Sequence, residues 1–355
     1  MKNYQKRLLV FIIIILFCSD IVIPCTTFCF QYKGDWIYGR NYDWDVENCL
    51  IMVNKRNMQK AAMLEDNPVQ WVSKFGSITF NQYGREMPLG GMNEAGLVIE
   101  CMWLAQTEYP HSDNRPQLQE LQWIQYHLDT SRTVKEVIES SKKIRISANQ
   151  SQPLHFLICD RKGHSVTIEF LEGKMKAHTG KTLPVSALTN NTYEYCVSLW
   201  KANNGDETLS SFKTANYSVK RFIWATKGVA ATARIVDPVS HAFNILEKVS
   251  VTKTMFRIVY DVKNGRIYFK NKSNANIRSL NFKAFDYSCK TPVKILDILA
   301  PLKGDITDKF EDYTMNANLD LIRKSFKGTR FLRDTADENL KLMAAYPDRL
   351  LCKEQ

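Results

Sequence analysis

A cysteine at the start of a strand pattern is the feature that most constrains this chain. Cys25 follows an apolar leader and opens a run of β-forming residues that extends to residue 32. If residues 1–24 are removed, Cys25 carries a thiol and a free α-amine. Such an amine has an ordinary pKa of about 7.7–8.0, so at neutral pH a useful fraction can accept the thiol proton. The sequence therefore predicts a nucleophile and its base on one terminal residue, with the rest of the chain organised around it.

Residues 1–24 have the pattern of a secretory signal peptide. A basic start precedes the apolar residues 8–17, a stretch too short to span a bilayer comfortably. We therefore expect export to the periplasm or the exterior, and no stable membrane span in the mature form. No small-residue cleavage pattern ends at Pro24, so cleavage near residues 18–19 followed by self-processing to Cys25 is a second expectation.

The composition is that of a globular protein, with 45% apolar and 24% charged residues. The formal charge of +11 is spread along the chain without a basic run of five residues, which argues against a nucleic-acid partner. The cysteines show no C-x-x-C pair and no histidine at metal-ligand spacing, so we expect no metal site and no cofactor. Seven cysteines follow Cys25, so they cannot all pair with one another, and no disulfide scaffold is expected.

Short strand patterns separated by tight turns run through most of the chain. A turn at residues 33–35 joins the first strand to a second that begins at Trp36. Another hairpin has an Asn-Gly turn at residues 264–265, which is among the strongest hairpin signals. Helical periodicity is found at residues 115–128, 134–141, 193–203, 216–231 and 238–248, and in a charged tail after residue 286. These patterns predict layered antiparallel sheets covered by helices rather than a doubly wound parallel sheet.

The first hairpin brings two charged side chains toward the cysteine. Because the arms of a hairpin lie side by side, Arg40 and Asp43 are expected near the start of the first strand, beside Cys25. An ordinary surface ion pair between the two fits the same spacing.

Six short motifs occur in one order within residues 25–290. They are Cys25-Thr26, Gly39-Arg40-Asn41-x-Asp43, Gly91-Met92-Asn93-Glu94-x-Gly96-Leu97, Pro153-Leu154-His155, Leu188-Thr189-Asn190 and Arg221-Phe222. Together they resemble the choloylglycine hydrolases, the bile salt hydrolases and penicillin V acylases of the N-terminal nucleophile superfamily. The resemblance implies an α+β fold, a four-layer αββα sandwich of two antiparallel sheets flanked by helices, and hydrolysis of a linear amide. It implies an amide hydrolase domain at 25–290, which leaves 291–355 as a helical C-terminal extension packed on the same domain.

The resemblance also implies roles for individual residues. Cys25 corresponds to the nucleophile, and Arg40 and Asp43 to the pair that positions the terminus, Asp43 accepting a hydrogen bond from the α-amine. The guanidinium of Arg40 is expected to lower the thiol pKa from about 8.5. Asn190 resembles the side-chain donor of the oxyanion hole, and Arg221 resembles a further arginine of the charge network.

Two tryptophans depart from part of the family. Trp103 stands where bile salt hydrolases carry Asn and some penicillin acylases carry Tyr, and Trp44 directly follows Asp43. Tryptophans at both places resemble the Gram-negative branch, whose members include penicillin V acylases that also cleave N-acyl homoserine lactones. This resemblance implies that both rings bind substrate and that a backbone N–H at Trp103 serves the oxyanion hole. Core packing explains each tryptophan equally well.

We therefore expect an exported cysteine amidase that hydrolyses a small-molecule acyl amide through a thioester on Cys25. A conjugated bile salt, penicillin V and an N-acyl homoserine lactone all remain candidate substrates. Two alternatives are an acyltransferase on the same fold and, if Cys25 is not freed, a non-catalytic exported binding protein. A papain-like mechanism is disfavoured because the sequence around Cys25 lacks the pattern of such proteases. Relatives are often tetramers, which makes a homo-oligomer a further expectation.

Overall fold

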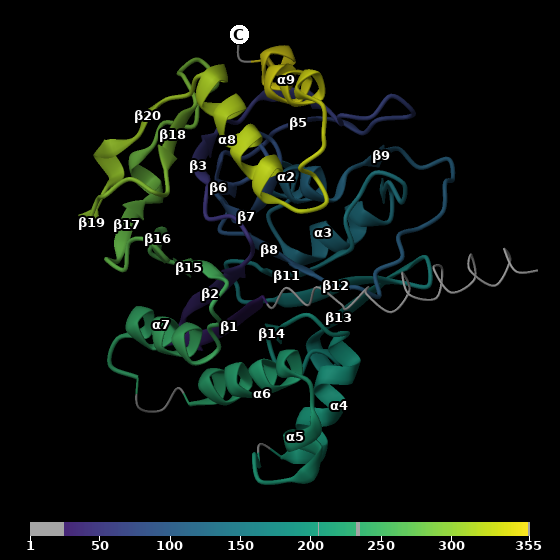
Figure 1. The fold of residues 1–355 in the computed structure, drawn as a ribbon, viewed down its shortest axis with the longest axis vertical. Coiled ribbons are helices and arrows are strands. Elements are labelled where there is room, and N and C mark those ends of the chain that lie inside the picture. Colours follow the sequence, from purple (N-terminus) through teal and green to yellow (C-terminus); the bar gives the residue numbers. More distant parts are fainter. Residues whose placement is uncertain (1–24, 205, 232–234, 354–355) are drawn as a thin grey trace, which may run out of the picture.

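The computed structural model describes residues 25–204, 206–231 and 235–353, and Figure 1 shows their arrangement. The predicted signal peptide, residues 1–24, lies outside these residues.

Two large sheets form the centre of the described chain. The first has seven strands in the order β14 (Ala187–Leu188), β1 (Thr26–Tyr32), β2 (Asp35–Asp43), β15 (Thr254–Asp261), β16 (Arg266–Asn271), β17 (Arg278–Asn281) and β19 (Gly304–Asp305). The second has nine strands in the order β13 (Lys174–Thr179), β12 (Ser165–Leu171), β11 (Leu154–Cys159), β8 (Val98–Trp103), β7 (Pro88–Asn93), β6 (Ser77–Asn81), β3 (Leu50–Asn54), β18 (Lys294–Asp297) and β20 (Glu311–Asp312). Apart from the parallel pair β17–β19, neighbouring strands in both sheets are antiparallel.

Helices and two small sheets complete the fold. The helices are α2 (Glu120–Thr130), α3 (Val134–Ser141), α4 (Tyr193–Asn203), α5 (Ser210–Thr214), α6 (Tyr217–Ala230), α7 (Pro238–Lys248), α8 (Met315–Gly328) and α9 (Asp337–Ala345), with 3₁₀ turns η1 (Gly180–Thr182), η3 (Phe282–Ala284), η4 (Thr307–Lys309) and η5 (Tyr346–Arg349). The small sheets pair β9 (Gln117–Leu118) with β10 (Arg145–Ile146), and β4 (Met58–Ala61) with β5 (Gln70–Val72) and β21 (Leu351–Cys352).

The layers follow from which helix packs on which sheet. Helices α6 and α7 pack on β1, β2, β14 and β15, and α2 packs on β7 and β8 of the other sheet (Figure 1). The inner faces meet in a core where Phe80 stacks on Phe256 and the Tyr38 hydroxyl donates to the Leu157 carbonyl oxygen at 2.8 Å. The predicted α+β sandwich of antiparallel sheets flanked by helices is confirmed. No helix among the described residues is long and apolar enough to cross a membrane.

The β1–β2 hairpin forms as predicted. Lys33 and Gly34 have φ angles of +48° and +81°, so both central residues of the turn lie in the left-handed region that a tight hairpin requires. The resulting register pairs Thr27 with Arg40, which places the start of β1 beside the end of β2.

Two segments differ from their predictions. The tail after residue 290 is not helical from its start, because β18 pairs with β3 and β19 with β17 before α8 begins at Met315. These strands have two to four residues, too few for alternation to be recognised. The helix predicted at 115–128 begins only at Glu120, because residues 117–118 form β9.

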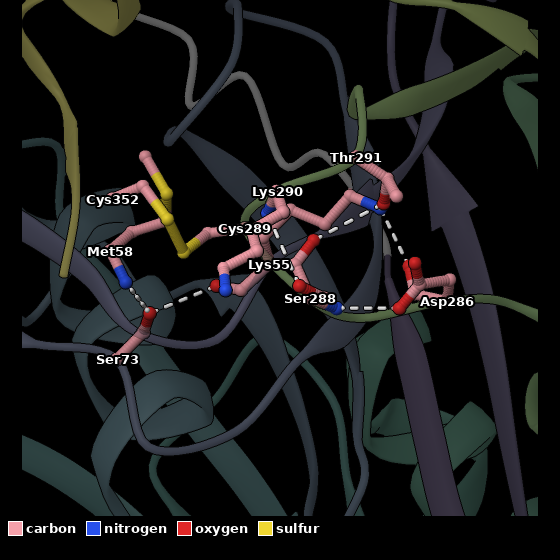
Figure 2. Close-up of a disulfide and its surroundings, with 9 residues drawn as sticks. All are labelled: Lys55, Met58, Ser73, Asp286, Ser288, Cys289, Lys290, Thr291 and Cys352. Atoms are coloured by element: carbon pink, nitrogen blue, oxygen red, sulfur yellow. Dashed lines mark hydrogen bonds between the residues drawn. A yellow bond between two sulfur atoms is a disulfide. The ribbon is translucent and has the colours of Figure 1, made fainter. Parts of the chain in front are cut away.

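One disulfide joins two cysteines far apart in the sequence. Cys289 and Cys352 are 63 residues apart, and their Cα atoms lie 5.5 Å from each other (Figure 2). The bond ties the loop before β18 to β21, where Cys352 pairs with Met58. Closing a loop of this length contributes roughly 4 kcal/mol in the chain-entropy account. The seven cysteines after Cys25 could not all pair with one another, so at least one of them had to be free. The described cysteines outside the disulfide are all free and buried: Cys25, Cys29, Cys49, Cys101, Cys159 and Cys196.

Candidate active site

The backbone of Cys25 is held by two side chains from distant segments. Its nitrogen donates to Asn190 Oδ1 at 2.6 Å, and Asn190 lies two residues after the end of β14, the neighbour of β1. Arg221, on α6, donates through Nη1 to the Cys25 carbonyl oxygen at 2.5 Å and through Nη2 to Asn190 Oδ1 at 3.0 Å. In the full-length chain this nitrogen is a peptide N–H, and removal of residues 1–24 turns it into an amine beside the same acceptor.

The Cys25 thiol is almost fully enclosed. The residue is 3% exposed, and its Sγ lies 3.7 Å from the backbone oxygen of Asp43. Burial raises the pKa of this thiol above its ordinary value, and Arg40, followed by Arg221, acts in the opposite direction. The predicted effect of Arg40 is present, but burial outweighs it. In the uncleaved chain, burial therefore favours the neutral thiol over the thiolate.

Asp43 has different partners from those predicted. Its Oδ1 accepts a hydrogen bond from the Thr254 hydroxyl, on the paired strand β15, and its Oδ2 lies 4.0 Å from Arg221 Nη1. Burial raises the pKa of Asp43 to about 6, against the opposing effects of Arg221 and Thr254. The Cys25 nitrogen, which we expected to face this carboxylate, donates to Asn190 instead. Asp43 therefore contacts Cys25 Sγ directly through its backbone oxygen. Its carboxylate is connected to the Cys25 backbone only indirectly, through Arg221.

Arg40 is part of a buried ion pair that links the two large sheets. Its Nε lies 3.2 Å from Glu100 Oε2, and the Tyr260 hydroxyl donates to Glu100 Oε1 at 2.5 Å. A Cβ on Gly90 would lie 2.1 Å from the same carboxylate, so the absent side chain makes room for it. Sequence reasoning missed Glu100, although a charged residue inside the apolar strand 97–104 was a signal that could have found it.

Asn190 also contacts the strand that carries Trp103. Its Nδ2 donates to the Trp103 carbonyl oxygen at 2.8 Å, so the side chain bridges β1, α6 and the end of β8. This orientation agrees with the network, since Oδ1 faces two donors and Nδ2 faces an acceptor. An amide NH₂ has two hydrogens, and this bond uses one.

A cavity of about 240 Å³ lies against the thiol. Cys25, Arg40, Trp44 and Trp103 line it, so the structure brings these predicted residues to one space. The ring centroids of Trp44 and Trp103 are 6.2 Å apart. The remaining lining is mainly apolar, with a polar group from residues 119–120 and 150–152: Tyr42, Tyr83, Met87, Leu89, Cys101, Met102, Gln119, Glu120, Leu121, Gln150, Gln152, Leu154, Phe326, Phe331, Leu332 and Met343.

The structure therefore places the seven predicted site residues around one terminus and one cavity. Asn190 and Arg221 bind the Cys25 backbone, the backbone oxygen of Asp43 contacts the thiol, and the other three line the cavity. Sequence reasoning missed Thr254 and the C-terminal residues of the cavity. In the part of the chain that the structure describes, no group of three or more His, Cys, Asp or Glu side chains is arranged to hold a metal ion.

A buried histidine–carboxylate network supports the segment that carries Asn190. His155 lies 2.6 Å through Nε2 from the Thr189 carbonyl oxygen and 3.1 Å through Nδ1 from Glu169 Oε1, which also accepts from the Tyr193 backbone. His155 is thus a satisfied core histidine, as expected for a histidine in an apolar strand. Burial raises the pKa of Glu169, but hydrogen bonds from His155 and His178 lower it to about 2.

This network predicts a pH-dependent loss of stability in Glu169→Gln. Because the folded pKa of Glu169 lies below its ordinary value, the ionised carboxylate stabilises the fold above about pH 4.5, and this contribution is lost as the pH falls toward 2. We expect the substitution to lower the free energy of unfolding at pH 7 by on the order of 3 kcal/mol, and by roughly half of that or less at pH 3. Urea unfolding at both pH values measures this. The exposed Glu172→Gln is the control and should change neither value. An equal loss at both pH values in Glu169→Gln contradicts the assignment.

Comparison with known proteins agrees with this geometry. The model of the linear amide C–N hydrolases, choloylglycine hydrolase family, matches residues 25–231. A penicillin V acylase from Pectobacterium atrosepticum is 25% identical over 320 residues, covering 76% of this chain and 84% of that protein. The structure of a penicillin V acylase from Agrobacterium tumefaciens has a TM-score of 0.71 at 26% identity, covering 82% of this chain and 98% of the other. A variant of conjugated bile acid hydrolase from Clostridium perfringens shares the fold, with a TM-score of 0.63 at 18% identity over 77% of this chain and 96% of the other. The chain therefore belongs to the choloylglycine hydrolase family and is a linear amide C–N hydrolase.

Proposed function

We propose that the protein is an exported cysteine amidase that removes a compact apolar acyl group from an amide, with Cys25 as its nucleophile once residues 1–24 are cleaved. The observation that carries this proposal is the position of Cys25. Its thiol lines an apolar cavity, while its nitrogen and carbonyl oxygen are held by Asn190 and Arg221. A terminal amine in that place is close enough to its own thiol to act as the base.

Acylation begins with transfer of the thiol proton to the α-amine, directly or through one water. The thiolate Sγ then bonds to the substrate carbonyl carbon, and the π electrons of the carbonyl move to its oxygen. The second hydrogen of Asn190 Nδ2 is the donor for this oxyanion, while the first stays on the Trp103 carbonyl. When the C–N bond breaks, the ammonium returns its proton to the leaving amine, and the acyl group remains on sulfur as a thioester.

Deacylation repeats these steps with water. The α-amine takes a proton from water, the hydroxide adds to the thioester carbonyl, and the C–S bond breaks. The sulfur leaves as a thiolate and recovers its proton from the ammonium, and the acyl group is released as a carboxylic acid. Enclosure of the thiol explains why a built-in base is needed, since burial raises its pKa.

The size and lining of the cavity favour a small acyl group. Its volume of about 240 Å³ is below the range of roughly 300–1,000 Å³ that is usual for drug-sized ligands. Trp44 and Trp103 offer flat apolar faces to such a group. The phenoxyacetyl group of penicillin V and a short N-acyl chain fit this description better than a steroid, and the similarity to two penicillin V acylases points the same way.

The disulfide supports export. Disulfides persist in oxidising compartments and are rare in the cytosol, and Cys289–Cys352 ties the C-terminal strand to the domain. Together with the leader pattern this favours a periplasmic or secreted protein. Cell fractionation of the tagged full-length chain tests it, and retention of the uncleaved protein in the cytosol contradicts it.

A panel of amides tests the activity. Intact-mass measurement first establishes that the purified protein begins at Cys25, and the mature protein is then assayed with penicillin V, an N-hexanoyl homoserine lactone and glycocholate. We expect kcat/KM to be highest for one of the first two substrates. Assays with added amines separate hydrolysis from acyl transfer. A correctly folded protein that begins at Cys25 and cleaves none of the three contradicts the proposal.

A further inference from the structure

We propose that the segment formed by α8, α9 and their connection, residues 315–345, is the specificity wall of the acyl cavity, with the Phe331 ring setting the shape and length of the acyl group. This inference rests on the proposed function and names the part of the chain that selects its substrate. The wall is a positioning and selecting element, and the reacting groups lie elsewhere.

The cavity is built from two separate parts of the sequence. Cys25, Asn190 and Arg221 lie within residues 25–231, the stretch that the family model matches. Four cavity residues come from beyond that stretch: Phe326, Phe331, Leu332 and Met343. The chemistry and one wall of the cavity are thus carried by different segments. A change in the C-terminal wall can alter which acyl group fits without moving the nucleophile.

Phe331 completes an aromatic cluster at the cavity. Its ring centroid lies 6.4 Å from that of Trp44, edge-on, and 6.1 Å from that of Trp103. These distances are in the range of favourable aromatic pairs. Phe331 is nevertheless 48% exposed, an unusual state for a large apolar ring beside two tryptophans. Because all three rings line the cavity, an aromatic acyl group bound there can pack against them, so an aryl-acetyl or aryloxyacetyl group is the class that the cluster suits.

Polar contacts hold the wall in place at the α8–α9 connection and along α8. The Tyr83 hydroxyl lies 3.0 Å from Thr329 Oγ1, two residues before Phe331. The Arg85 backbone donates to Asn318 Oδ1, on α8, at 2.8 Å. These bonds connect the segment to residues beside β6 and β7, so the Phe331 ring is positioned before substrate arrives.

A hydrogen bond holds the chain directly after the wall, and a disulfide follows at Cys352. The Tyr346 hydroxyl, directly after α9, donates to the Ala61 carbonyl oxygen, and β21 pairs with β4. Cys352 on β21 is bonded to Cys289, and Figure 2 shows Lys55 and Met58 among the surroundings of this disulfide. The wall is therefore attached to the domain along α8, at the α8–α9 connection and directly after α9, which restricts its movement.

Two wall variants and a matched control test this role. Phe331→Ala removes the ring of a half-exposed residue, and Phe331→Trp enlarges it. Leu342→Ala is the control, because Leu342 is 62% exposed on α9 and does not line the cavity. Hydrolysis is measured for one leaving amine joined to phenoxyacetyl and to straight acyl groups of increasing length.

We expect Phe331→Ala to raise KM for the phenoxyacetyl amide about tenfold with little change in kcat, and to shift the preferred straight chain to a longer one. Phe331→Trp should shift it to a shorter one. Leu342→Ala should keep the wild-type profile. Unchanged acyl preference in both Phe331 variants, or a kcat loss equal for all acyl groups, overturns the proposal.

Failure of the proposed function is distinguishable from failure of the wall. If the wild type cleaves no amide in the series, binding of the acids phenoxyacetate and decanoate is measured by calorimetry instead. Phe331→Ala should then weaken phenoxyacetate binding about tenfold relative to wild type and to Leu342→Ala. Equal binding by all three proteins overturns the wall assignment, whatever the activity is.

Discussion

Cys25→Ala should lower kcat/KM for the preferred acyl amide by about 10³-fold or more, because the covalent path through the thioester disappears with the sulfur. The loss should fall on kcat, since the cavity that binds the acyl group keeps its other walls. Cys49→Ala is the matched control, as Cys49 is another buried free thiol, and it does not line the cavity. Steady-state kinetics on both variants and on wild type measure the effect.

Processing must be separated from chemistry in this experiment. If the chain cleaves itself before Cys25, alanine at that position also blocks maturation. Each variant is therefore checked by intact mass and also prepared with its mature terminus released by an external protease. Cys25→Ser keeps a hydroxyl that is far less acidic than the thiol and should retain more activity than alanine. A folded, mature Cys25→Ala with wild-type rates would exclude Cys25 as the nucleophile.

The parts of the site that could be predicted from sequence are those fixed by local geometry. The turn at Lys33 and Gly34 is a short-range signal, and a tight turn sets the register of the strands on either side. Once this hairpin exists, Arg40 and Asp43 must lie at the same end of the sheet as Cys25. Asn190 and Arg221 lie 165 and 196 residues from Cys25, and only the family resemblance pointed to them.

The pairing of individual atoms could not be predicted. Asn190 was predicted only as the oxyanion donor, and the sequence did not show that its Oδ1 accepts from Cys25 and Arg221 while its Nδ2 donates to the Trp103 carbonyl oxygen. Asp43 was expected to accept a hydrogen bond from the Cys25 nitrogen, but it accepts one from the Thr254 hydroxyl. Thr254 is on β15, and none of the six motifs includes it. Such choices depend on the relative positions of several distant segments, which patterns of residue type do not encode.

The sign of the thiol pKa shift was also outside the reach of sequence. A nearby arginine was the visible feature, and its effect on a thiol is a lower pKa. Burial has the opposite effect and depends on the packing of both sheets and of the cavity, so only the folded structure shows that it is the larger one for Cys25.

The C-terminal wall was missed for a different reason. Strands of two to four residues and a disulfide between cysteines 63 residues apart leave no periodic signal. The half-exposed Phe331 lies in the connection between α8 and α9, and nothing in the sequence of this connection points to Trp44 and Trp103. Its place follows only from the docking of α8 and α9 on the domain.

Asn190→Ala should lower kcat by about 10²–10³-fold with a smaller change in KM, as expected when a fixed oxyanion donor is lost. The same substitution also removes the acceptor for the Cys25 nitrogen and for Arg221, so alanine alone does not separate the two roles. Asn190→Asp does, because it keeps an oxygen where Oδ1 lies and lacks the Nδ2 donor.

The comparison of the two variants assigns the role. If Asn190 acts as the oxyanion donor, kcat should fall to a similar extent in Asn190→Asp and in Asn190→Ala, although the Asp variant retains the acceptor for the Cys25 nitrogen. In the Asn190→Asp variant, the second carboxylate oxygen faces the Trp103 carbonyl oxygen, to which the amide had donated. Because two acceptors then face each other, the variant should lose stability, and thermal unfolding of both variants is recorded to correct for this loss. Near wild-type kcat in Asp with a large loss in Ala would mean that Asn190 acts by holding the terminus. The oxyanion would then need another donor, and the backbone N–H of Trp103, proposed from the sequence, would be the first to test.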